Sequence, residues 1–249
     1  MEHVQITAST KMADVIHLDY LLLPIVGRFG INLGFGNKTV TEVCTEHGIN
    51  CSFLLDILNN YHNHNYFAEE QFEDYPTTLI VEYLKNTHAH YLNVKIPELE
   101  KMVELIIEQS SAENKTNNQL IGNFFEEYKQ ELIRHLNHEE NDLFPYAYEL
   151  EEALETNLIK ESTLAKIEKN TISQDDVDHN HLEEKLFDLK NLIIKFLPPV
   201  TRRDIMENLL IELFRLENDL KDHSRIEDKV LLPKMIHLEQ KIMAHRVSK

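Results

Sequence analysis

Residues 135–145 read HLNHEENDLFP, and residues 223–233 read HSRIEDKVLLP. Each stretch contains a histidine, a glutamate four residues later, an apolar pair and a proline ten residues after the histidine. Side chains four residues apart project from the same face of an α-helix. We therefore expect His135 and Glu139 to lie together, and we expect the second stretch to repeat that arrangement on another helix.

Apolar residues mark the buried face of each of these two helices. The second pair consists of His223 and Glu227. An ionised carboxylate in a protein core is unfavourable unless it is paired or coordinated. A hydrogen bond between the histidine and the glutamate would satisfy one such pair, but two carboxylates that meet between facing helices require a cation or protons. The apolar neighbours of the two pairs are Leu132, Leu136, Leu143 and Phe144 for the first, and Leu220, Ile226, Val230 and Leu231 for the second.

The composition of the whole chain favours helices joined by short connections. Its 249 residues are 42% hydrophobic and include only six glycines, seven prolines and no tryptophan. This composition predicts an all-α fold rather than a turn-rich β fold. Long amphipathic segments cover about residues 78–110, 117–153, 173–197 and 202–245. Four such segments predict an antiparallel four-helix bundle.

A small helical N-terminal domain is expected before the bundle, at residues 1–65. Within it, Thr39 and Glu42 have the spacing of a capping box at the start of a short helix. Residues 66–77 show no sustained periodicity and contain a proline, so they are the expected linker. Residues 78–249 then form the expected bundle domain.

The charge of the chain argues against several classes of partner. A net charge of −18 with scattered Lys and Arg disfavours a nucleic-acid partner. No apolar run approaches the roughly 20 residues that span a bilayer, so no membrane partner is expected. The first residues show no apolar signal region. The two cysteines, Cys44 and Cys51, are expected to be reduced, buried thiols. We therefore expect a cytoplasmic protein.

The first predicted bundle helix offers two histidines, His88 and His90. His88 lies four residues after Leu84 and eight after Ile80, on the apolar stripe of that helix. His90 lies roughly 160° further round the helix axis. We therefore expect His88 to face the core and His90 to face solvent.

The third predicted helix poses the same choice between His179 and His181. His179 is the expected inward residue because leucines follow it at helical spacing. His138 lies off the face that His135 and Glu139 define, so it is expected to be exposed or to lie beside the site. The leucines that follow His179 are Leu182, Leu186 and Leu189.

Each bundle helix thus contributes one inward histidine, and two of the helices add a glutamate. Four imidazoles and two carboxylates suit a pair of divalent transition metals, with the glutamates bridging the two ions. Nitrogen and oxygen ligands without thiolate favour iron or manganese over structural zinc. Bundle cores are a common location for dinuclear carboxylate sites. Such a site leaves positions for a bridging oxygen and a small ligand.

These residues resemble the hemerythrin-like family, and most closely its branch of di-iron proteins that repair iron centres, also called iron–sulfur cluster repair proteins. The two repeated histidine–glutamate–proline stretches carry the specific part of the resemblance, which covers most of the chain. Residues 78–245 resemble the di-iron bundle, and residues 1–60 resemble the small helical domain that precedes it. The family's metal ligands fall on His88, His135, Glu139, His179, His223 and Glu227.

The resemblance implies a function as well as a fold. It implies two iron ions, joined by an oxo or hydroxo bridge, with manganese as the less favoured metal. It implies repair of damaged iron–sulfur clusters, or iron supply to them, under nitrosative or oxidative stress. Iron–sulfur proteins or their apo forms would be the iron acceptors. Nitric oxide or oxygen would be the small ligand, with binding or reduction of nitric oxide as a related activity. Whether the site turns over as an enzyme is left open.

The chain departs from the family at two places. The family's N-terminal domain usually has an adjacent cysteine pair in the turn after its first helix, whereas that turn here reads GINLGFGN. Thiol chemistry by such a pair is therefore not expected. The family also often has adjacent histidines on the first bundle helix, whereas this chain reads THAHY, so His90 stays an alternative to His88.

Two other functions remain open from the sequence. An oxygen carrier or sensor of the hemerythrin type needs a second histidine four residues after His179, where this chain has Glu183. That type also uses an aspartate five residues after the last histidine, so Asp228 is an alternative ligand to Glu227. A metal-free helical interaction module is the third reading, and it would bury six polar side chains that only satisfy one another.

Overall fold

A computed structural model of the chain describes residues 4–63, 72, 74–108, 115–169, 172, 179–196 and 203–247. Every regular element within these residues is helical, apart from an isolated bridge between Lys11 and Thr39. The predicted all-α class is therefore confirmed. Most of the predicted linker, residues 66–77, lies outside the described residues. None of the described helices combines the length and apolar character that crossing a membrane requires.

Contacts divide the chain into two compact units. The first consists of Met1–Thr87 with Ile226–Lys234, and the second consists of His88–Arg225 with Met235–Lys249. This grouping by contacts does not test the domain boundary expected at residues 66–77, which stays a prediction.

The first unit begins with four short helices whose ends follow the sequence signals. The Thr39 side chain accepts a hydrogen bond from the Glu42 N–H at 3.3 Å, and Glu42 Oε2 accepts from the Thr39 N–H at 2.7 Å, so the predicted capping box is confirmed. Gly48 ends that helix with a φ of 66°, which glycine adopts without strain. Asn50 caps the next helix. The four helices are α1 (Met12–Leu18), α2 (Leu22–Arg28), α3 (Val40–His47) and α4 (Cys51–His62).

Aromatic rings fill the core of the first unit. Phe53 of α4 meets the rings of Tyr75 and Tyr83 edge-on, with centroids 5.1 and 6.0 Å away. Phe29 stacks on Tyr83 at 5.2 Å. Because Tyr83 lies on α6 (Thr77–His90), these contacts fix the first part of that helix.

The two cysteines are free thiols in the first unit. Cys44 is buried and Cys51 is half-buried, so only the first matches the expectation of a buried thiol. Burial, followed by a hydrogen bond with the Cys51 thiol, raises the pKa of Cys44 to about 12. Cys44 therefore stays protonated and unreactive at neutral pH.

The remaining helices include four π-helical segments, which are labelled η. The first long run continues from α6 through η1 (Tyr91–Lys95) into α7 (Ile96–Glu108). The other helices are α8 (Lys115–His138), η2 (Glu139–Leu143), α9 (Phe144–Thr156), α10 (Glu161–Glu168), α12 (His179–Asn191), η3 (Leu192–Phe196), α13 (Arg203–Ile226), η4 (Glu227–Leu231) and α14 (Leu232–Val247).

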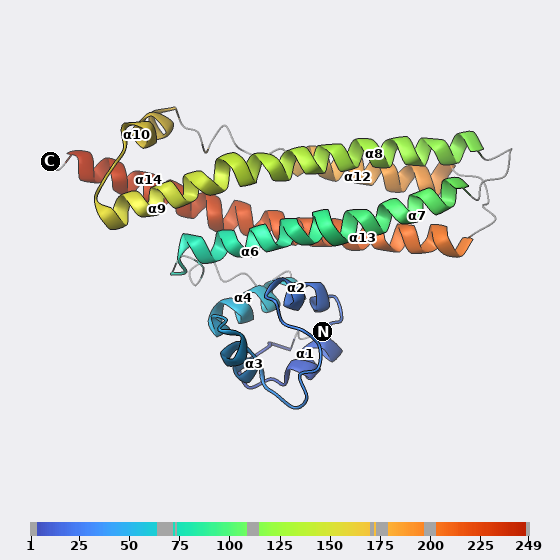
Figure 1. The fold of residues 1–249 in the computed structure, drawn as a ribbon, viewed down its shortest axis with the longest axis horizontal. Coiled ribbons are helices and arrows are strands. Elements are labelled where there is room, and N and C mark those ends of the chain that lie inside the picture. The colour runs from blue at the N-terminus through green and yellow to red at the C-terminus, as the bar shows by residue number, and fades with distance from the viewer. Residues whose placement is uncertain are drawn as a thin grey trace. The chain divides into compact units, whose positions relative to one another are not determined.

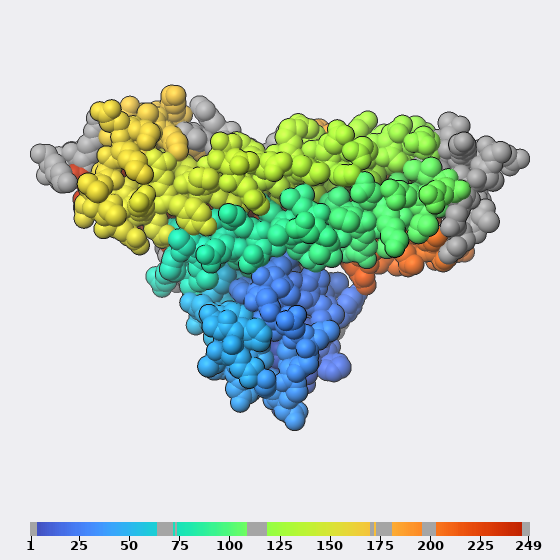
Figure 2. All heavy atoms as spheres, viewed as in Figure 1, coloured from blue at the N-terminus to red at the C-terminus, as the bar shows by residue number. Residues whose placement is uncertain are grey.

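One apolar core joins four helical runs of the second unit. Buried side chains from η1–α7, α8, α12–η3 and α13 meet in it, and Figure 1 shows these helices lying alongside one another. The space-filling view shows α7 and α8 (green and yellow-green) in contact along their length (Figure 2). Each fully buried Leu, Ile or Phe contributes about 1.5–3 kcal/mol relative to exposure. The core includes Leu99, Val103, Phe125, Leu132, Leu136, Leu186, Leu189, Leu209, Leu213 and Leu216.

Proline explains the position of three π-helical segments. Pro97, Pro145 and Pro233 each lie two residues after the end of η1, η2 and η4, respectively. Proline lacks an N–H, and its ring clashes with the carbonyl four residues earlier in an α-helix. In each case the residue before the proline instead bonds to the carbonyl five residues earlier, as Phe144 does to Glu139. At Pro97 the helix therefore continues through a π segment into α7.

Candidate metal centre

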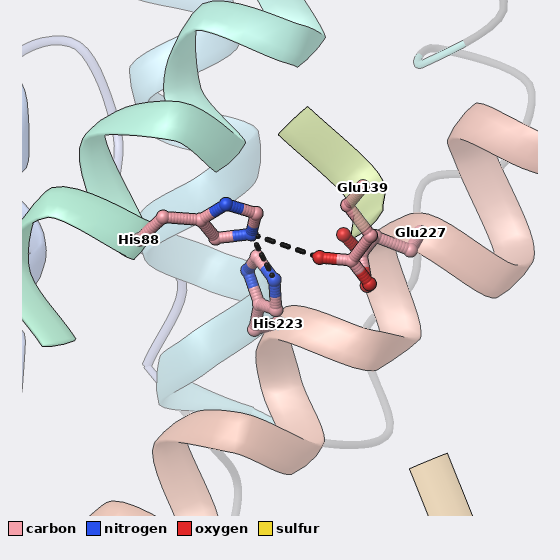
Figure 3. A group of neighbouring side chains, drawn as sticks. All are labelled: His88, Glu139, His223 and Glu227. Carbon is pink, nitrogen blue, oxygen red and sulfur yellow. Dashed lines mark hydrogen bonds and ion pairs between the residues drawn. The ribbon is translucent and has the colours of Figure 1, made fainter. Parts of the chain in front are cut away.

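Four buried side chains from three parts of the sequence converge on one point. They are His88 of α6, Glu139 of η2, His223 of α13 and Glu227 of η4 (Figure 3). One ligand atom from each lies within 4.8 Å of the ligand atoms of the others. Each of the four residues is at most 1% exposed. This cluster could hold a metal ion.

The two histidines of the cluster point their ring nitrogens at each other. His88 Nε2 lies 3.2 Å from His223 Nε2, and the rings meet edge-on with centroids 5.0 Å apart. Two imidazole nitrogens at this distance either share one proton or direct two lone pairs at the same cation. Phe144 stacks on His88 at 5.3 Å and holds the imidazole in place.

Glu139 joins histidines from two different helices. Its Oε2 lies 3.1 Å from His88 Nε2, and its Oε1 lies 2.9 Å from His135 Nε2. Each carboxylate oxygen thus has a histidine of its own. Glu139 therefore links the imidazoles of His88 and His135.

Burial of two carboxylates in one cluster sets its electrostatics. Glu139 and Glu227 are 0% and 1% exposed, so water cannot screen their charges. Isolated carboxylates lose several kcal/mol of solvation in such a place, even after relaxation of the protein. A divalent cation between them offsets both charges at once, whereas in its absence protons must do so.

The donor set fits a first-row transition metal. Ligands on opposite sides of such an ion lie about 4 Å apart, since each bond is about 2.0–2.2 Å long. The spread of 4.8 Å therefore requires only small inward shifts. Imidazole nitrogen and carboxylate oxygen, without thiolate, suit iron or manganese and also fit other divalent ions. The geometry does not select among these metals.

Of the other two predicted ligands, the structure describes the side chain of His135 alone. The side chain of His135 is 11% exposed and reaches the cluster through Glu139. His179 begins α12, but its side chain is outside the part of the chain that the structure describes. The assignment of the six residues as metal ligands therefore stays a prediction.

The structure also places the residues that the sequence set aside. His138 is exposed and pairs with Asp142 at 3.0 Å, as expected for a residue off the inward face. His181 and Asp228 are exposed. His90 differs from the expectation of a solvated side chain, because it is half-buried with its ring 6.4 Å from that of the buried Tyr91.

A small cavity lies beside the cluster within the second unit. It measures about 20 Å³ and is lined by His135 and His223 together with Glu183, Glu217 and leucine side chains. That volume accommodates one water molecule or a ligand of similar size. Burial alone would raise the pKa of Glu217, but the Lys190 ammonium that hydrogen-bonds to it keeps the pKa below its ordinary value. Glu217 is therefore an anion at neutral pH.

Sequence reasoning missed one residue that contacts the cluster. Glu140 Oε1 lies 3.1 Å from His88 Nδ1, on the side of the ring away from Glu139. A signal was present, because both repeated stretches have an acidic residue directly after the glutamate, Glu140 in the first and Asp228 in the second. Helix periodicity did not predict the contact of Glu140, because consecutive residues of an α-helix point about 100° apart.

Comparisons of this chain with models of known families, with curated proteins and with solved structures gave no match. The functional interpretation therefore rests on the residues of the cluster and on their geometry.

Proposed function

We propose that this chain is a di-iron protein of the hemerythrin-like kind, with an antiparallel four-helix bundle, which supplies iron to damaged iron–sulfur clusters or restores them under nitrosative or oxidative stress. The observation that carries the proposal is the buried group of His88, Glu139, His223 and Glu227. The apolar core shared by four helical runs supports the bundle.

The position of Glu139 between two histidines supports the proposal of two ions rather than one. One ion would bind His88 and His223, whose Nε2 atoms are 3.2 Å apart. The second would bind His135, on the other oxygen of Glu139. His179 is the proposed further ligand on that side. When bound, the iron pair would supply a redox-active centre with room for one small ligand.

The protein residues have distinct roles in this proposal. The histidines would bind the ions through unprotonated nitrogens, the two glutamates would offset part of the positive charge, and the surrounding leucines exclude bulk water. The cavity beside His135 and His223 has room for one water molecule or a ligand of similar size. Of the proposed ligands, nitric oxide and oxygen come nearest to that size.

The cavity also favours a second candidate, an oxygen or redox sensor or carrier. A sensor needs only that a diatomic ligand reach the iron pair, which the cavity would allow. The exposure of Asp228 argues against the ligand pattern of the oxygen carrier, in which an aspartate five residues after the last histidine binds metal. Glu227 occupies the cluster instead.

Iron transfer tests the proposed function directly. Protein loaded with Fe²⁺ without oxygen is mixed with the apo form of a [4Fe–4S] dehydratase, with sulfide and a chelator that captures free iron. We expect recovery of the dehydratase cluster, measured by its absorption and activity, at chelator concentrations that stop recovery from free Fe²⁺. The metal-free protein is the control.

Recovery no better than with free Fe²⁺ would contradict iron supply. If the reduced protein then formed a stable, reversible oxygen complex, the sensor or carrier would be the function that remains.

A further inference from the structure

Both nitrogens of the His88 ring have an acidic partner, and the two partners are consecutive residues. Glu139 lies at Nε2, at 3.1 Å, and Glu140 lies at Nδ1, also at 3.1 Å. Both belong to η2, and His88 comes from α6. We propose that Glu140 is a positioning residue, which fixes the tautomer and orientation of His88 so that the lone pair of Nε2 can bind metal. This inference rests on the proposed metal site.

The chemistry of imidazole requires such a choice. A neutral imidazole carries one N–H, on either nitrogen, and only the nitrogen without the proton can bind a metal. A carboxylate oxygen accepts a hydrogen bond, so Glu140 favours the tautomer of His88 with the proton on Nδ1, whereas Glu139 favours a proton on Nε2 in the absence of a cation. With the proton on Nδ1, the lone pair lies on Nε2, which is the atom that faces His223 at 3.2 Å.

The location of the two carboxylates suits two different roles. Glu139 is completely buried, whereas the side chain of Glu140 is 36% exposed. The buried carboxylate of Glu139 is placed to serve as a ligand of the proposed ion. The carboxylate of Glu140, at Nδ1 of His88, is partly hydrated and therefore keeps its charge without the full cost of burial. Hydrogen bonds from the outer nitrogen of a metal-binding histidine to a carboxylate typically change metal affinity by about 10–100-fold.

The π-helical backbone explains why consecutive residues can share this task. Pro145 forces the helix to take in an extra residue at η2, and the segment begins at Glu139. The wider turn presents Glu139 and Glu140 to the same imidazole. Phe144, which ends the π segment, stacks on the face of that ring at 5.3 Å, so the imidazole is held at both nitrogens and on one face.

The test compares Glu140→Ala, Glu140→Gln and Asp142→Asn by anaerobic titration with Fe²⁺. We expect Glu140→Ala to bind Fe²⁺ about 10–100-fold more weakly than the unchanged protein. Glu140→Gln keeps an oxygen acceptor and should recover most of that loss. Asp142→Asn removes a charge from the same π segment, where Asp142 pairs with the exposed His138, and should leave the affinity unchanged.

A second readout does not depend on metal. In ¹⁵N-histidine-labelled, metal-free protein, the ¹⁵N resonances of His88 report which nitrogen carries the proton. We expect a larger share of the tautomer with the proton on Nδ1 in the unchanged protein and in Glu140→Gln than in Glu140→Ala, because only Glu139 at Nε2 remains as a carboxylate acceptor in the last variant. Circular dichroism of each variant checks that the helices are intact.

Equal Fe²⁺ affinities for Glu140→Ala and Asp142→Asn, or equal tautomer populations of His88 in the unchanged protein and in Glu140→Ala, would overturn the positioning role. Failure of the unchanged protein to bind Fe²⁺ at all would instead overturn the proposed function, and the His88 resonances would still show whether Glu140 sets the tautomer.

Discussion

Glu139→Ala is expected to abolish tight metal binding, because Glu139 is the residue that contacts histidines of both proposed ion positions. Its two oxygens lie 3.1 Å from His88 Nε2 and 2.9 Å from His135 Nε2. Removing the side chain takes one anionic ligand from each proposed ion. The next residue, Glu140, does not replace it, because its carboxylate contacts the far nitrogen of His88.

Thermal unfolding measures this loss. A ligand present at 100 times its Kd stabilises the folded state by about 2.7 kcal/mol. For a chain of this size, that corresponds to a rise in Tm of roughly 5–10 °C, at about 2–4 °C per kcal/mol. We expect Fe²⁺ to produce such a rise in the unchanged protein and in Asp142→Ala, and none in Glu139→Ala. Asp142 is the matched control because its exposed carboxylate lies on the same π segment.

A normal rise in Tm and a full metal complement in Glu139→Ala would show that this carboxylate does not bridge the ions. The metal-free variants also need comparison, because Glu139→Ala changes the packing of the core. The difference in Tm with and without Fe²⁺ separates that packing effect from metal binding.

His88→Ala and His90→Ala are expected to differ strongly, although the two histidines are two residues apart. His88 is fully buried and lies 3.2 Å from His223 within the cluster. His90 is half-buried and lies against Tyr91. Loss of His88 removes a proposed ligand and should weaken Fe²⁺ binding strongly. The loss should exceed the factor of about 10–100 that is typical when a residue hydrogen-bonded to a metal-binding histidine is removed. His90→Ala should change the affinity little.

Anaerobic titration with Fe²⁺ measures both affinities. His88→Gln, which keeps most of the side-chain volume, controls for the cavity that alanine leaves in the core. Equal weakening by His88→Ala and His90→Ala would contradict the assignment of His88, as would an unchanged affinity in His88→Gln.

Much of the cluster could be predicted because helix geometry is local. Four-residue spacing placed His223 and Glu227 on one face, and the apolar stripe through Ile80 and Leu84 selected His88 over His90. These arguments need only the helix period and the identity of the buried residues. The structure brings His88, Glu139, His223 and Glu227 together, in keeping with that reasoning.

The features that escaped prediction depend on backbone distortion and packing. The prolines that follow the π-helical segments are visible in the sequence. Whether a helix kinks at such a proline or takes in an extra residue before it depends on what packs against the helix. The contact of Glu140 with His88 depends on the same distortion, because an ideal α-helix would point Glu140 about 100° away from Glu139. The half-buried state of His90 likewise depends on Tyr91, which is fully buried.

Metal content is the measurement that tests the central claim most directly. The protein is purified without oxygen, its metals are counted by mass spectrometry, and the optical spectrum of the oxidised form is recorded. We predict about two iron ions per chain and the charge-transfer band of an oxygen-bridged ferric pair. A well-folded protein with no bound metal, and with none taken up from added Fe²⁺, would contradict the account and would mean that the buried histidines and glutamates only satisfy one another.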